Sequence, residues 1–205
     1  MTATFQNGDA MQFDKNSLKG TLFKTGDDTY QTPRMDASTR ALITIGDLHH
    51  ELIEGKYWRS GMNFSLSSGQ VATFAFTTPT GSKEVHITWT LDSSADGTFA
   101  LLEDVTSFAG GVSVTPLNQN RRSSITSQVV CLSGMTGADL ITPTGGTTIL
   151  SAVLYAGKKM AVNREAGEGF IFKKGSNYLF RYTNGTNANV IQLACEWHSH
   201  EEMQP

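Results

Sequence analysis

The sequence predicts an all-β protein: a jelly-roll-like β-sandwich preceded by an extended N-terminal arm. The 205 residues include 20 glycines, and these combine with many serines and threonines to separate short apolar runs, as turns separate strands. The clearest runs alternate between apolar and polar residues with a period of two, which is the spacing of a half-buried strand. About eight to ten such strands favour a sandwich, with the jelly roll as the leading topology.

The strongest strand pattern lies between residues 169 and 197. Tyr178, Phe180 and Tyr182 fall on one face of an extended segment, and Asn184-Gly185 then provides a pair that tolerates a tight turn. Four apolar side chains share one face of the returning strand: Ile191, Leu193, Cys195 and Trp197. We therefore expect this meander to carry much of the core.

The chain ahead of the meander divides into two parts. Residues 1–40 are polar and show no sustained period, which indicates either an arm that orders on contact with another molecule or a disordered tail. Residues 41–205 form the expected sandwich domain. Its other strands are expected within 41–53, 64–66, 71–76, 85–91, 99–105, 110–116, 125–132 and 149–155, with loops at 134–146 and 161–169.

Composition excludes several classes of protein. The net charge of −3 argues against a general nucleic-acid grip, which needs a basic surface. No apolar run is long enough for a membrane helix, and the first residues lack the pattern of an export signal. In that setting we expect Cys131 and Cys195, both within apolar runs, to be free buried thiols.

Histidine is the first candidate for chemistry. His49, His50, His198 and His200 could form a metal cluster if their segments paired in one sheet. Adjacent strand residues point to opposite faces, however, so His49 and His50 cannot easily bind one ion together. Surface or interface histidines are therefore favoured over a metal site.

Catalytic patterns are weaker still. No serine lies in a G-x-S-x-G motif. The carboxylate pairs Glu103-Asp104 and Glu165/Glu168 have the residue types of a glycosidase, but solvated loop charges are the commoner explanation. We expect no catalytic residues, no metal and no cofactor, and hence no enzyme.

Arg121 and Arg122 form the basic part of a polar segment at 118–124. The guanidinium fork binds backbone carbonyls and carboxylates in a bidentate manner. Two interpretations stay open: the pair pins a corner of the sandwich, or it contacts an acidic partner.

Three aromatic residues, Tyr57, Trp58 and Tyr155, lie near expected loops. Exposed aromatics often anchor interfaces or stack on sugars, although in a sandwich they equally cap the core. Together with the two arginines they are the candidate interface residues.

Several short motifs occur in an order that one family shares. They are His-His-Glu at 49–51, Lys-Glu-Val-His at 83–86, Leu-Leu-Glu-Asp at 101–104, Asn-x-Asn-Arg-x-Ser at 118–123, Phe-Ile-Phe-Lys at 170–173, Asn-Tyr-Leu-Phe-Arg-Tyr-Thr-Asn at 177–184 and Cys-Glu-Trp at 195–197. Over residues 41–200 this order resembles the jelly-roll capsid cement or decoration proteins of tailed bacteriophages.

The resemblance implies a structural protein of the virion, made in the host cytoplasm and bound to the outside of the capsid lattice. Its implied partners are the major capsid protein and further copies of itself, as a dimer or trimer, and it brings no catalytic residues. Two alternatives stay open: a head-fibre or tail-associated module that binds a receptor or glycan, and a cupin-like metal enzyme.

Overall fold

A computed structural model describes residues 2–4, 10–12, 23–24, 30–31, 52–81, 83–137, 139–162 and 169–201. The chain splits into two compact units, Met1–Asp47 with Met203–Pro205, and Leu48–Glu202. In the first unit, β1 (Thr2–Thr4) pairs with β2 (Ala10–Gln12), and β3 (Phe23–Lys24) pairs with β4 (Tyr30–Gln31). The domain boundary predicted after residue 40 lies outside the described residues.

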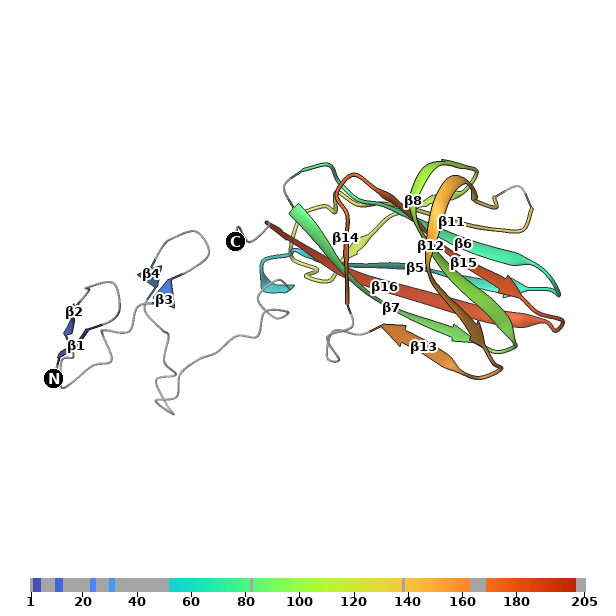
Figure 1. The fold of residues 1–205 in the computed structure, drawn as a ribbon, viewed down its shortest axis with the longest axis horizontal. Coiled ribbons are helices and arrows are strands. Elements are labelled where there is room, and N and C mark those ends of the chain that lie inside the picture. Colours follow the sequence, from blue (N-terminus) through green and yellow to red (C-terminus); the bar gives the residue numbers. More distant parts are fainter. Residues whose placement is uncertain are drawn as a thin grey trace. The chain divides into compact units, whose positions relative to one another are not determined.

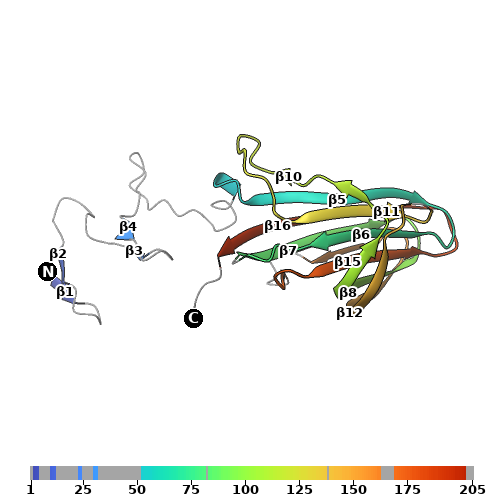
Figure 2. The ribbon, with the colours of Figure 1, turned by 90° about the horizontal axis from the view of Figure 1, so that it is seen from above.

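The second unit is a sandwich of two antiparallel sheets (Figure 1). The first sheet has the order β10-β5-β16-β7-β13, and β14 also pairs with β7. Its strands are β5 (Tyr57–Leu66), β7 (Lys83–Ser93), β10 (Leu117–Asn118), β13 (Lys159–Val162), β14 (Phe170–Phe172) and β16 (Asn189–Glu201). Figure 2 shows β5, β16 and β7 running side by side.

The second sheet has the order β12-β8-β15-β6-β11-β9. Its strands are β6 (Val71–Thr77), β8 (Gly97–Ala109), β9 (Val112–Val114), β11 (Val130–Met135), β12 (Thr142–Leu154) and β15 (Asn177–Asn184). The prediction of an all-β sandwich is confirmed. No helix long and apolar enough to cross a membrane occurs among the described residues.

The long strands pair in a nested order. β5 pairs with β16, β6 with β15, β7 with both β13 and β14, and β8 with β12. Successive pairs alternate between the two sheets. The unit is therefore organised like one long hairpin wrapped across both layers.

The core between the sheets is aromatic. Tyr178, Phe180 and Tyr182 are fully buried, as the period of two predicts. Phe180 lies at the centre, with its ring centroid 5.2 Å from that of Trp89 and 6.1 Å from that of Phe99. The Trp89–Phe180 contact is edge-to-face, a geometry that adds to the free energy gained by burying the rings.

A second apolar cluster covers part of the outer face of the second sheet. Ala75 and Leu179 alternate with core residues and so point outward, yet both are buried, together with Val105 and Ile141. The segment between β11 and β12 lies over them, since the Ile141 amide donates a hydrogen bond of 3.1 Å to Thr73 Oγ1. This sheet is thus buried on both faces at one end.

Asn189 is the centre of a buried polar network at the opposite end of the sandwich. Its Oδ1 accepts hydrogen bonds from the amides of Ser94 (2.9 Å) and Ala95 (3.0 Å). Its Nδ2 donates to Tyr182 Oη (2.7 Å) and to Asn184 Oδ1 (2.9 Å). One amide side chain therefore joins the β7–β8 turn to β15.

Three predicted boundaries are wrong. β12 begins at Thr142, inside the loop predicted at 134–146, because Gly145 and Gly146 form a bulge with φ of 70° and 100° and do not end the strand. The strand predicted at 125–132 begins only at Val130. β13 extends into the loop predicted at 161–169.

Candidate interaction surface

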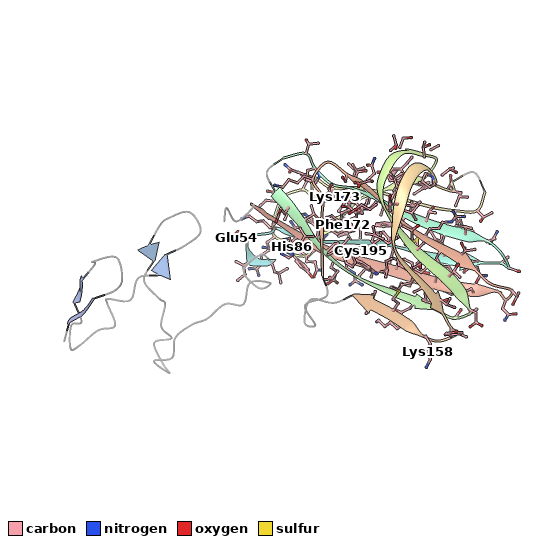
Figure 3. The ribbon with its side chains drawn as sticks, in the orientation of Figure 1. Glu54, His86, Lys158, Phe172, Lys173 and Cys195 are labelled. Atoms are coloured by element: carbon pink, nitrogen blue, oxygen red, sulfur yellow. The ribbon has the colours of Figure 1, made fainter. Side chains whose placement is uncertain are left out.

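Two asparagines pin a corner of the sandwich beside the first sheet. Asn118 Nδ2 donates hydrogen bonds to the carbonyls of Gly55 (2.7 Å) and Ile125 (2.9 Å). Asn120 Nδ2 donates to the carbonyl of Ile53 (2.8 Å). These bonds hold the loop at 117–125 against the helical turn that precedes β5, a region that the label of Glu54 marks in Figure 3.

The pinned loop carries exposed apolar side chains. Ile53, Leu117 and Ile125 are 55%, 57% and 47% exposed. Arg121 and Arg122 lie on the same loop and are exposed. We call these five residues the corner patch. Apolar side chains combined with arginine are the composition that protein interfaces favour.

The two open interpretations of the arginine pair can now be compared. Arg121 makes one long hydrogen bond of 3.4 Å to the Asn118 carbonyl, while Arg122 contributes its backbone amide, which donates to Asn120 Oδ1 (3.1 Å). The asparagines therefore hold the loop in place, and the two arginines are exposed to solvent. Asn118 and Asn120 lie two residues apart in a turn-rich segment, a pattern from which their structural role could have been predicted.

A shallow groove adjoins the corner patch. It has a volume of about 340 Å³ and is lined by side chains of β5, β16 and the segment 114–117, with Arg59, Asn63 and Gln192 among them. Leu117 belongs to both the groove and the corner patch. Gly61 lines the groove and approaches β16 closely, since an added Cβ there would meet the Leu193 carbonyl oxygen.

Two interpretations of the three aromatic residues were open, exposure at an interface or burial over the core, and two of the three are buried. Trp58 is buried in the core because it starts the inward face of β5, and Tyr57 is buried on the other face. Tyr57 Oη donates a hydrogen bond of 2.9 Å to Glu196 Oε2. Tyr155 is 64% exposed.

Tyr155 lies far from the corner patch. It follows Leu154, which pairs with Gly97 at the end of the sandwich where β7 finishes, whereas Asn118 pairs with Trp58 at the other end. The five predicted interface residues therefore do not form one surface. The two arginines and Tyr155 mark separate exposed regions.

Of the four candidate histidines, only His198 has a described side chain. His198 is buried and its ring lies 4.9 Å from that of His86, its neighbour across β16 and β7. His49 and His50 lie outside the described residues, and for His200 only the backbone is described. Among the described residues, no group of three or more His, Cys, Asp or Glu side chains could hold a metal ion.

Glu103 and Asp104 take part in a charged clamp. Lys173 Nζ donates to Glu103 Oε2 (2.8 Å) and Asp104 Oδ2 (2.6 Å), and Tyr178 Oη donates to Glu103 Oε1 (3.0 Å). The hydrogen bond from Lys173 lowers the pKa of the Asp104 carboxyl below its usual value. Both carboxylates therefore bind one lysine and connect β8 to the turn after β14. The other candidate pair, Glu165 and Glu168, lies outside the described residues.

Both cysteines are free and buried, as predicted. Burial raises the pKa of the Cys131 thiol to about 12, and burial likewise raises the pKa of Cys195 well above its usual value. Neither thiol is therefore an ionised nucleophile at neutral pH.

A scan against protein-family models found no match to this sequence, and a search of curated proteins also found none.

Proposed function

We propose that this protein is a structural protein of a tailed-bacteriophage virion. In this role it binds the outside of the capsid lattice and cements neighbouring major capsid subunits. It acts as a homo-oligomer, a dimer or trimer, and is not an enzyme. We further propose that its sandwich is a jelly roll, because nested pairs that alternate between two sheets are what a wrapped hairpin of that topology requires.

The observation that carries this proposal is the corner patch. A cement protein needs a contact surface that exists before it meets the lattice, because ordering a loop on binding costs affinity. The hydrogen bonds from Asn118 and Asn120 provide that order in advance. The exposed isoleucines and Leu117 supply apolar area, and Arg121 and Arg122 supply pairing groups for acidic side chains of a capsid subunit.

Repetition over the lattice explains why a modest patch suffices. Each bound copy adds interface between subunits and so raises the free energy needed to separate them. When one oligomer contacts several subunits, its binding sites act together with a high effective concentration. The segment 1–40 is proposed to extend this contact as an arm that orders on binding.

The test begins with the copy number of the protein in purified virions. Hundreds of copies, near parity with the shell subunit or a simple fraction of it, are expected for a lattice protein. About a dozen copies would instead indicate a vertex or tail component, and the receptor-binding alternative would take the lead. Two of the three aromatic residues proposed to bind a receptor or glycan, Tyr57 and Trp58, are buried, which weakens that alternative.

Binding to capsids that lack the protein tests the corner patch directly. The double variant Arg121→Glu/Arg122→Glu is expected to weaken binding at least about tenfold by reversing the charge of the patch. The matched control is Lys158→Glu/Lys159→Glu, which changes the net charge equally on exposed residues at another margin of the sandwich. Equal loss in both double variants would show that general charge, and not the corner patch, governs attachment.

A further inference from the structure

The second sheet ends on a long strand that is paired on one side only. β12 spans thirteen residues and pairs with β8, and no other described strand pairs with it. Its sequence, TPTGGTTILSAVL, contains no charged residue. An unpaired edge presents a row of backbone donors and acceptors that another strand can use.

The other sheet edges are protected in the usual ways. β9 and β10 are only three and two residues long. β13 carries Lys159, which follows Lys158, and the three-residue β14 is followed by Lys173. Short strands, lysines, prolines and bulges are among the devices by which proteins prevent unwanted pairing of edges. β12 has Pro143 and its bulges before Leu150, and the stretch from Leu150 to Leu154 has none of these devices.

One part of β12 is regular enough to act as a template. The bulges fall at Thr144/Gly145 and between Thr148 and Leu150, and from Leu150 to Leu154 the register with β8 is continuous. Ser151 and Val153 lie on the outer face of this stretch and are exposed, Val153 by 60%. Tyr155, also exposed, follows directly.

We propose that the 150–154 stretch of β12 pairs in the antiparallel direction with the same stretch of a second copy. The twofold axis then joins two second sheets into one continuous sheet. Because both strands of such an interface have the same sequence, any charge near the twofold axis would have a like charge opposite it or diagonally across the seam. An uncharged edge is therefore the one that suits a second copy. An exposed valine and tyrosine beside the seam add apolar contact.

This inference specifies the oligomer within the proposed function, but it is tested without any capsid. Sedimentation equilibrium of the full chain is expected to show a dimer of twice the 22.2 kDa chain mass. A monomer or a trimer would overturn the pairing while leaving capsid attachment through the corner patch untouched. Loss of capsid binding by the arginine variant would in turn leave this dimer intact.

A charged side chain introduced on the β12 edge tests whether this edge forms the dimer interface. Val153→Lys is expected to weaken the dimer at least about tenfold, because two lysines meet at the seam. A mixture of Val153→Lys with Val153→Glu is expected to restore association. The control is Val190→Lys, at a residue 52% exposed on β16, which lies inside the first sheet; a dimer equally sensitive to both lysines would overturn the proposal.

Cysteine cross-linking gives a second test with a smaller change of the edge. Pairing of 150–154 with itself places the twofold axis at Ala152, so that Ser151 of one copy lies opposite Val153 of the other. Single cysteines are introduced at Ser151 and at Val153 in separate chains, and the two native thiols are buried and do not interfere. An oxidised mixture of the two variants is expected to give a disulfide-linked dimer, and no cross-link in that mixture would overturn the inference.

Discussion

Removing the Asn189 side chain is expected to destabilise the sandwich strongly. Asn189 is 2% exposed, so after Asn189→Ala the groups that it contacts cannot form replacement hydrogen bonds with bulk water. The buried Ala95 amide loses its acceptor, and Asn184 Oδ1 loses a donor, while Tyr182 Oη keeps a contact with Ser93 Oγ at 2.7 Å. At about 1–3 kcal/mol for each stranded group, we expect a loss of about 3 kcal/mol.

Urea unfolding followed by tryptophan fluorescence measures this loss in the sandwich alone. All three tryptophans, Trp58, Trp89 and Trp197, are buried there. With a slope of about 2 kcal/mol per molar urea, the midpoint should fall by about 1.5 M. Asn187→Ala, an exposed asparagine of the same turn, is the control and should change little. A loss below about 1 kcal/mol for Asn189→Ala would refute the reasoning, because that is the size of an ordinary substitution.

Four further predictions follow from other features. Gly134→Ala should cost about 1–3 kcal/mol by overpacking, because an added Cβ would collide with the Asp139 carbonyl oxygen. Gly81→Ala, whose added Cβ meets no other atom, is the control for the same urea assay. Because the pKa of Asp104 is lowered in the folded state, its contribution is present above its unfolded pKa and disappears as pH falls through the folded value. The stability difference between wild type and Asp104→Asn should therefore shrink as urea titrations move to lower pH, and a difference independent of pH would contradict this. Cys131 and Cys195 should react with a thiol reagent only at the rate of unfolding, since both are buried; rapid labelling of the native protein would show otherwise. Deleting residues 1–40 should weaken attachment to capsids and leave tryptophan fluorescence unchanged, and undiminished attachment would remove the arm from the proposal.

The inward side chains of the sandwich could be predicted because burial on one face imposes a period of two. Tyr178, Phe180 and Tyr182 follow this rule, and they lie where the alternation places them. The same rule failed for Leu179, which is also buried because the segment before β12 covers the outer face. That cover depends on contacts between segments far apart in the chain, which a local pattern does not contain.

The candidate site was predicted in part, for a related reason. Arg121 and Arg122 were identified by their charge, which is visible in the sequence, and they are exposed on a surface loop. The roles of Asn118 and Asn120 depend on the carbonyls of Ile53 and Gly55, which lie more than sixty residues away. The sequence left open whether Trp58 is exposed or buried, because its position on the inward face is set by the register of β5 with β16, and no nearby residue specifies that register.

The nested strand order has a consequence for how the protein is made. β16 lies between β5 and β7 at the centre of the first sheet, and its Trp197 pairs with Trp58, which lies near the other end of the domain's sequence. The first sheet therefore cannot form completely until β16, the last strand, has been synthesised. At about 5–20 residues per second, synthesis leaves β5 without its central neighbour for several seconds. Contacts between such distant segments also form slowly once the chain is complete. After β12 has been made and before β16 follows, the uncharged β12 edge is exposed as well, so assembly of the sandwich competes with pairing between unfinished chains.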